Sequence, residues 1–140
     1  MDLETVTEIE LAGELLAYGA DTLIEAFDGA PQVECPVQHH FGPGVYIREC
    51  AMPAGSIVVG HYHRQSSLNV MLKGRMVLLV DGQITVIDAP YMTISGPGRK
   101  AAYVLDDVVW QNIWATEETD IDKLEDMFVD KHAAIDGGLA

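Results

Sequence analysis

Two histidines separated by one residue, His61 and His63, are the side chains of this chain best suited to chemistry. They end a run of β-branched residues, 56–63, that predicts a strand. Because side chains alternate along a strand, both imidazoles point to the same side. Two neutral imidazoles placed in this way can bind one metal ion. The same pair also fits a second interpretation, in which it is hydrogen-bonded inside a polar barrel, with Ser67, Asn69 and Tyr103 as partners.

The residues around this pair follow a recognisable spacing. Gly55 precedes His61 by five intervening residues, and Gly74 closes the segment after His63. This pattern resembles the first motif of the cupin superfamily, in which a glutamate stands where this chain has Ser67. The resemblance implies a small jelly-roll barrel. In such barrels the metal is typically bound by three histidines and one carboxylate.

A second motif of the superfamily is visible only in part. Gly96-Pro97-Gly98 stands where a Pro-x-Gly turn is expected, and Ala101 occupies the place of the last metal-binding histidine. Within the superfamily the chain is similar to short proteins encoded by tailed bacteriophages, through the segment 39–46. The resemblance therefore implies a cupin barrel whose metal site is degenerate.

Two other residues are candidates to replace the missing ligands. Glu49 lies in the preceding predicted strand, and Tyr103 shares a face with Ala101. We expect no cofactor. If one binds, the resemblance implies a divalent transition metal (Fe, Mn, Ni or Zn) at His61 and His63, with Glu49 or Tyr103 completing the site. His39 and His40 are interpreted as part of a solvated loop before Pro43.

Two tryptophans form a further group. Trp110 and Trp114 are four residues apart on a predicted strand, with Asn112 between them on the same face. They suit stacking on a planar ligand, but packing in a core is the more usual role of such large side chains.

Length and composition describe one folded domain. The chain has 140 residues, of which 49% are hydrophobic. No apolar run reaches the ~20 residues of a membrane helix, and the first residues lack the plan of a secretory signal. Cys35 and Cys50 are expected to be reduced and partly buried. These features predict a cytoplasmic protein, in the host cytoplasm or the virion if the gene is carried by a phage.

The net charge of −14 is concentrated at the two ends. Residues 1–30 contain eight acidic residues and no Lys or Arg, and residues 117–140 contain eight acidic residues and two lysines, whereas residues 31–116 are balanced. Clustered Lys and Arg are what nucleic-acid binding requires, so this class of partner is excluded. We expect no membrane partner either, and a homo-oligomer or larger assembly.

The chain divides into three parts. Residues 1–30 predict an acidic helical arm, with a break at Gly19 and a helix cap at Asp21. Residues 31–116 predict a barrel of short strands: 45–50, 56–63, 67–72, 75–80, 83–87, 91–95, 101–105 and 108–115. Asp81-Gly82 is a hairpin signal. Residues 117–140 predict an acidic C-terminal helix and tail. The expected fold class is all-β, a cupin-type barrel with helices at both ends.

Two functions follow as hypotheses. The first is a non-catalytic structural or binding protein with a degenerate metal site, which oligomerises because its helical arms need a surface on which to bury their apolar stripes. The likeness to phage proteins makes a virion or accessory component one form of it. The alternative is a divergent metal-dependent isomerase, lyase or dioxygenase that uses His61 and His63.

Overall fold

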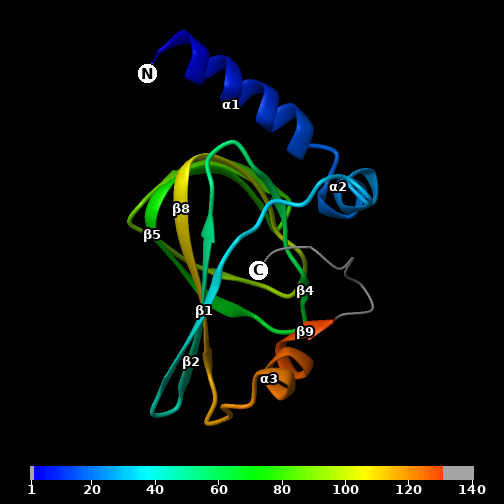
Figure 1. Cartoon of the computed structure of the whole chain (residues 1–140). Helices are drawn as coiled ribbons and strands as arrows, with labels where there is room; N and C mark the ends of the chain where they lie inside the picture. The colour runs from blue at the N-terminus through cyan, green and yellow to red at the C-terminus, as the bar shows by residue number, and fades with distance from the viewer. Residues whose placement is uncertain (1, 131–140) are drawn as a thin grey trace.

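The computed structural model describes residues 2–130, which form a strongly curved sheet with helices at its two ends (Figure 1). Along the chain the elements are α1 (Leu3–Leu16), α2 (Ala20–Ala26), β1 (Val37–Gly42), β2 (Val45–Met52), β3 (Ile57–Val59), β4 (Tyr62–His63), β5 (Ser67–Val80), β6 (Gln83–Asp88), β7 (Tyr91–Ser95), β8 (Ala101–Ala115), α3 (Ile121–Phe128) and β9 (Val129–Asp130). The all-β barrel with an N-terminal helical arm and a short C-terminal helix is confirmed.

The main sheet has seven antiparallel strands built around two long ones. Its order is β1-β2-β8-β5-β6, with β3 also paired to β8 and β7 also paired to β5. The first half of β5 pairs with β7, and its second half pairs with β6. Since each long strand changes partners along its length, the sheet curls around one interior. A separate pair, β4 and β9, lies beside it.

A bulge in β5 divides the barrel interior into two ends. The register between β5 and β8 shifts between Met71 and Met76. Asn69 and Met71 are buried before the shift, and Met76 and Leu78 are buried in the interior cluster after it, so the inward positions change from odd to even. Gly74 lies inside the bulge with φ +98°. Strand predictions at 67–72 and 75–80 are thus two halves of one strand.

Two local predictions from the sequence are confirmed. Asp81 and Gly82 both have positive φ, 49° and 76°, and connect β5 to β6 as a two-residue hairpin. At the other end of the chain, the carboxylate of Asp120 accepts hydrogen bonds from the backbone N–H groups of Asp122 (3.0 Å) and Lys123 (3.2 Å) and begins α3.

Two other predictions are wrong. His39 and His40 lie in strand β1, where they pair with Arg48 and Ile47 of β2, rather than in a loop. Asp21 does not cap α2, because Gly19 is the N-cap and makes no side-chain bond. The first error arises because β1 is fixed by pairing with β2, and the second because α2 already begins at Ala20, before Asp21.

Three buried clusters hold these elements together. The interior of the sheet is filled mainly by apolar side chains from β2, β3, β5, β6 and β8. On the outside, α1 and α2 pack Ala12, Leu16, Leu23 and Ile24 against β3, β5 and β8. The helical arm therefore buries its apolar stripe on its own barrel. The third cluster is formed by α3 with Tyr46 and Trp114.

The two cysteines are free and buried, as expected. Burial raises the pKa of the Cys35 thiol to about 11, so it is protonated and a weak nucleophile at neutral pH.

Within residues 2–130 no helix has both the length and the apolar character that crossing a membrane requires.

We predict that Gly74→Ala destabilises the protein by about 3 kcal/mol or more, measured as the free energy of unfolding in urea. A Cβ at this position would meet the backbone carbonyl of Asp107 and lie 2.8 Å from Val108 Cγ2, and φ is +98°. Gly82→Ala is the matched control, because Gly82 also has positive φ (76°) but open space around it. It should cost only about 1 kcal/mol. Equal losses for both variants would contradict the role given to the bulge.

Candidate functional site

His61 and His63 stand on either side of an exposed residue at one end of the barrel. The Tyr62 side chain is exposed, His61 is half-buried and His63 is buried. Strand β4 fixes His63 through Val129 of β9, and the His63 backbone also exchanges two hydrogen bonds with Gly98, at 2.8 and 3.0 Å. The predicted alternation around Tyr62 is therefore seen in the burial of the three residues.

The ring of His63 lies against an aromatic column. Its centroid is 5.7 Å from that of Trp114, with the planes tilted by 58°. Trp114 stacks in turn on Tyr46 (5.7 Å) and on Phe128 of α3 (4.6 Å). Helix α3 thus covers this end of the barrel with an aromatic side chain. Both Trp110 and Trp114 are buried core residues.

Ser67 belongs to a buried network of neutral side chains. Its hydroxyl donates to Asn69 Oδ1 (3.2 Å), which also accepts from Asn112 Nδ2 (2.6 Å). Asn69 Nδ2 donates to Ser95 Oγ (2.7 Å). All four residues are less than 5% exposed. The position at which the resemblance expects a carboxylate is therefore occupied by hydrogen-bonded neutral groups.

The two substitute ligands lie elsewhere. Glu49 faces the outer side of β2, where it accepts a hydrogen bond from Gln111 (2.8 Å) and lies 3.6 Å from His40 Nε2. The Tyr103 hydroxyl donates to Glu8 of α1 at 2.6 Å, and its ring packs in the cluster under the helices. Neither residue is brought to the histidines.

The metal centre implied by the resemblance does not fit these residues. Within residues 2–130 no three side chains of the types His, Cys, Asp and Glu converge on a point that could hold a metal ion. Two imidazoles alone do not supply the three or more protein ligands of a catalytic zinc, or the carboxylate of a non-haem iron site.

His39 has a different role from the one expected. Its ring stacks on Tyr46, and its Nδ1 is 2.7 Å from the Tyr46 hydroxyl. Burial lowers the pKa of His39, which favours the neutral ring. His39 thus extends the aromatic column toward the edge of the sheet.

Buried polar atoms near this network are suited to a small polar guest such as water. Arg48 Nη1, Asn112 Oδ1 and Trp114 Nε1 are buried and have no hydrogen-bond partner among the described residues. Arg48 and Asn112 are cross-strand neighbours, and Trp114 lies two residues further along the same face. Two donors and one acceptor are therefore close enough in register to share a bridging molecule.

The position next to Ala101 carries a residue that the sequence comparison missed. Ala101 packs in the outer cluster beneath α1 and α2, whereas Ala102 and Val104 belong to the interior cluster. By alternation Lys100 belongs with the interior residues. The sequence does contain a signal for this, because Lys100, Ala102 and Val104 occupy alternate positions and so face the same side of an extended chain.

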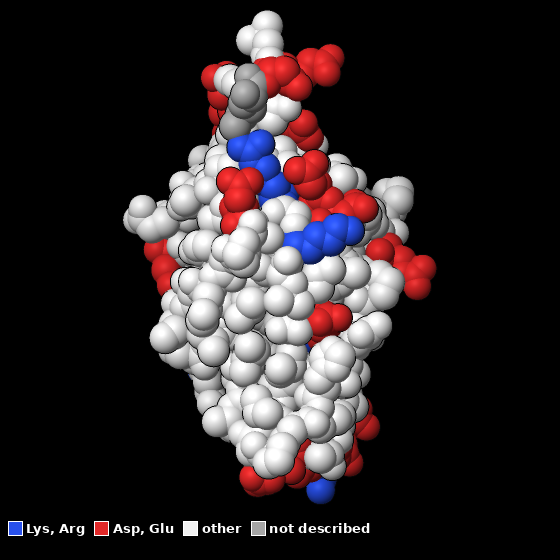
Figure 2. Space-filling view, turned by 90° about the vertical axis from the view of Figure 1, so that its left-hand side faces the viewer, with Lys and Arg blue, Asp and Glu red and all other residues white. Residues whose placement is uncertain are grey.

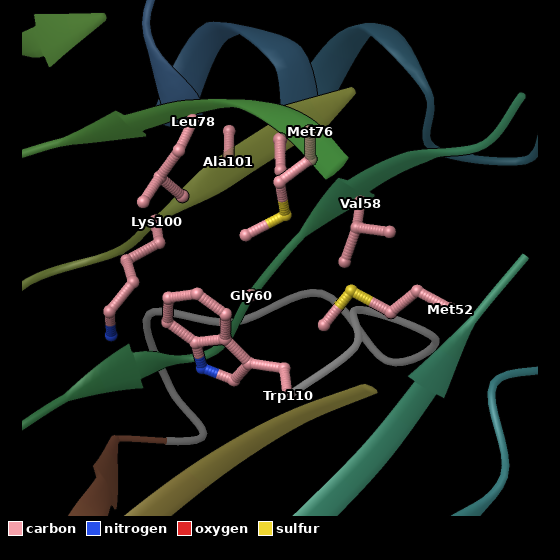
Figure 3. Close-up of a pocket in the computed structure, with 9 residues that line it drawn as sticks. Met52, Val58, Gly60, Met76, Leu78, Lys100, Ala101 and Trp110 are labelled. Atoms are coloured by element: carbon pink, nitrogen blue, oxygen red, sulfur yellow. The ribbon is translucent and has the colours of Figure 1, made fainter. Parts of the chain in front are cut away.

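Lys100 borders an apolar cavity of about 30 Å³ inside the upper end of the barrel. Met52, Val58, Met76, Leu78 and Trp110 supply most of its walls, and Lys100 is the one charged residue that lines it (Figure 3). Burial lowers the pKa of Lys100 to about 8, although the carboxylate of Asp81 opposes this shift. No ion pair of Lys100 is found within residues 2–130.

The neighbouring backbone holds Lys100 in place. Its carbonyl accepts a hydrogen bond from Gly60 N–H (2.9 Å), and the Gly60 carbonyl accepts one from Arg99 Nε (2.9 Å). Arg99 also pairs with Asp21 of α2 at 2.7 Å. Helix α2 thereby anchors the segment that carries the amine.

Comparison with solved structures finds proteins of similar fold at low identity. KdgF from Halomonas sp. is 8% identical over 67% of this chain and 93% of its own, with a TM-score of 0.51. A cupin superfamily protein from Desulfitobacterium hafniense is 14% identical, over 63% and 83% of the two chains, with a TM-score of 0.49. An RmlC-like cupin family protein from Methanocaldococcus jannaschii is 16% identical, over 59% and 80%, also with a TM-score of 0.49.

These likenesses concern the fold alone. A scan against models of protein families and a search of curated proteins give no match.

We predict that Lys100→Met stabilises the protein at pH 7 by about 1–2 kcal/mol, measured as the free energy of unfolding. Because the folded state holds the Lys100 proton less tightly than the unfolded state, the charged amine lowers stability below pH 8. This loss fades as the pH rises from about 8 toward the ordinary lysine pKa of about 10.4, so the gain in the variant should shrink over that range.

Lys123→Met is the matched control, since the Lys123 side chain is 71% exposed. It should change stability by less than about 0.5 kcal/mol at either pH. A Lys100→Met variant less stable than the parent at pH 7 would show that the amine is not held in an unfavourable environment.

Proposed function

We propose that this chain, which has the fold of the cupin superfamily, is a non-catalytic component that assembles with a second copy of itself through the outer face of its sheet. The proposal has two parts, the absence of metal catalysis and the self-assembly. The first is supported by the neutral network around Ser67 and Asn69 and by the outward direction of Glu49. The second rests on the apolar surface described next.

The observation that carries the proposal is a row of four aliphatic side chains across the outside of the sheet. Ile47 pairs with Ile113, Ile113 with Leu68, and Leu68 with Ile94, so one residue from each of β2, β8, β5 and β7 lies in register. Cross-strand partners project to the same side of a sheet. We call these residues the apolar row. Ile94 is 73% exposed, which is high for such a side chain.

The next row continues the apolar surface. Val70 pairs with Met92, which is 65% exposed, and with Gln111. Figure 2 views the molecule from the side on which β5 and β8 lie in Figure 1, and it shows a broad area with few charges between acidic residues at the top and the bottom. Ile94 and Met92 are the exposed members of this surface, and large apolar side chains exposed side by side mark an interaction surface.

A second copy is the occupant that suits this surface. With a net charge of −14, two copies repel each other unless their contact avoids the acidic ends, and the apolar row carries no charged residue. A two-fold axis lets the same row meet itself. The helical arm, proposed from the sequence as the assembly element, already buries Leu16, Leu23 and Ile24 on its own barrel.

A role in a bacteriophage particle stays a prediction from the sequence resemblance. Against the alternative, a metal-dependent enzyme using His61 and His63, stands the lack, among the described residues, of any group of three or more His, Cys, Asp and Glu side chains that could hold a metal ion. It is tested separately below.

We predict that Ile94→Glu converts a dimer, with twice the 15.3-kDa chain mass, into a monomer and weakens self-association at least about a hundredfold. Each dimer would bury two new carboxylates at the contact. Sedimentation equilibrium measures the change, and circular dichroism checks that the variant remains folded.

Leu11→Glu is the control, since Leu11 is 59% exposed on α1, away from the apolar row. It should leave the dimer intact. A monomeric parent protein, or dissociation by Leu11→Glu and not by Ile94→Glu, would overturn the assembly proposal.

We predict that protein purified without a histidine tag contains far less than one transition-metal ion per chain by elemental analysis. Adding EDTA should leave the midpoint of thermal unfolding unchanged, because the fold at Ser67 and Asn69 is held by neutral hydrogen bonds. Near-stoichiometric metal that is lost in the His61→Ala/His63→Ala variant would instead support the enzyme hypothesis.

A further inference from the structure

We propose that Lys100 and the apolar cavity beside it form a binding site for small aliphatic aldehydes, which the lysine amine captures as an imine. The site lies at the opposite end of the barrel interior from the Ser67 network, and it does not depend on whether the chain dimerises. It rests on three observations: the position of the amine, the character of the cavity, and the groups that surround both.

The amine is placed where a ligand can reach it. Lys100 is half-buried, and its side chain extends along the cavity beside Leu78 and Trp110 (Figure 3). Its backbone is fixed by the hydrogen bond to Gly60 and by the neighbouring Arg99–Asp21 ion pair. A nucleophile held in this way requires little reorganisation when a ligand binds.

The cavity suits an alkyl group. Its volume of about 30 Å³ is close to the share of one water molecule in the liquid, which is about the size of a methyl group, and methionine, valine, leucine and tryptophan side chains line it. A short hydrocarbon tail gains free energy there by leaving water. A carboxylate or phosphate would need several donors, and Nε and Nη1 of Arg99 already donate to the Gly60 carbonyl and to Asp21.

The environment also keeps the amine reactive. Burial holds the pKa of Lys100 at about 8, and Asp81, in the turn between β5 and β6, is the charged group acting on it. None of the other cavity-lining residues titrates. At pH 7.5 the unprotonated fraction is then roughly two hundred times that of an ordinary lysine.

The chemistry is balanced without any oxidant or reductant. The Nζ lone pair of Lys100 attacks the carbonyl carbon, a C–N bond forms, and the carbonyl oxygen takes up a proton from the nitrogen. The C–O bond then breaks and the hydroxyl leaves as water with the second proton of the nitrogen, whose lone pair forms the C=N bond, so amine and aldehyde yield imine and one water molecule.

The test uses the full chain with propanal and sodium cyanoborohydride at pH 7.5, which reduces the imine to a stable propyl-lysine. Peptide mapping by mass spectrometry then compares the extent of propylation at Lys100 with that at the exposed Lys73 and Lys123 of the same molecule. It also distinguishes these products from propylation of the N-terminal α-amino group. We expect Lys100 to be propylated at least about tenfold faster than either lysine. In urea the three rates should converge, because the cavity is lost.

Two comparisons make the result specific. Lys100→Arg keeps the charge and should abolish the fast propylation seen at Lys100, while Lys73 and Lys123 react as before. On the parent protein, the bulky 2,2-dimethylpropanal should lose most of the preference for Lys100, since the small cavity does not admit it. Equal rates at Lys100 and Lys123 with propanal would overturn the proposal, and so would an equal preference for the bulky aldehyde.

Discussion

The pairing of the two long strands, β5 and β8, is the constraint on which the rest of the structure depends. Each strand carries both ends of the barrel, and the bulge at Gly74 changes which residues of β5 face inward. Without that change, a strand that directs Asn69 into the interior would direct Val77 and Leu79 there as well. Those two residues instead pack under α1 and α2. One irregularity therefore lets a polar network, an apolar cavity and a docking surface for the helical arm share a single pair of strands.

The face of the strand on which a residue lies also explains which features could be predicted from the sequence. The hairpin at Asp81-Gly82 and the C-terminal helix depend on neighbouring residues, so local patterns were sufficient. The position of Ala101 was different, because motif spacing gives the distance from a turn but not the face of the strand. That face is set by the pairing of Ala101 with Val59 and Leu79, which are distant in the chain. The motif spacing therefore pointed to Ala101, whereas the residue that borders the interior cavity is its neighbour Lys100.

The positions of Glu49 and of the helical arm likewise depend on residues that are distant in the chain. The sequence showed that His61 and His63 share a side, but it did not show where Glu49 points. Strand β1, read as a loop, pairs its Gln38 and His40 with the outer side of β2 and so fixes that carboxylate outside the barrel. The helical arm followed the same rule. Its apolar stripe was visible, but only tertiary packing reveals that Val59, Val77 and Leu79 receive it.

Most of the buried side chains of the interior are neutral. A carboxylate at the position of Ser67 would have to be compensated by a metal or a cation, whereas Ser67, Asn69, Ser95 and Asn112 are linked by hydrogen bonds and remain neutral. Lys100 differs from them, since it is an amine beside an apolar cavity with no ion-pair partner among the described residues. Such a group lowers stability while it stays protonated, so the fold favours the form that has a free lone pair. The hydrogen-bonded network at Ser67 thus leaves no carboxylate at that position for metal chemistry, whereas at Lys100 desolvation itself supplies the reactive species.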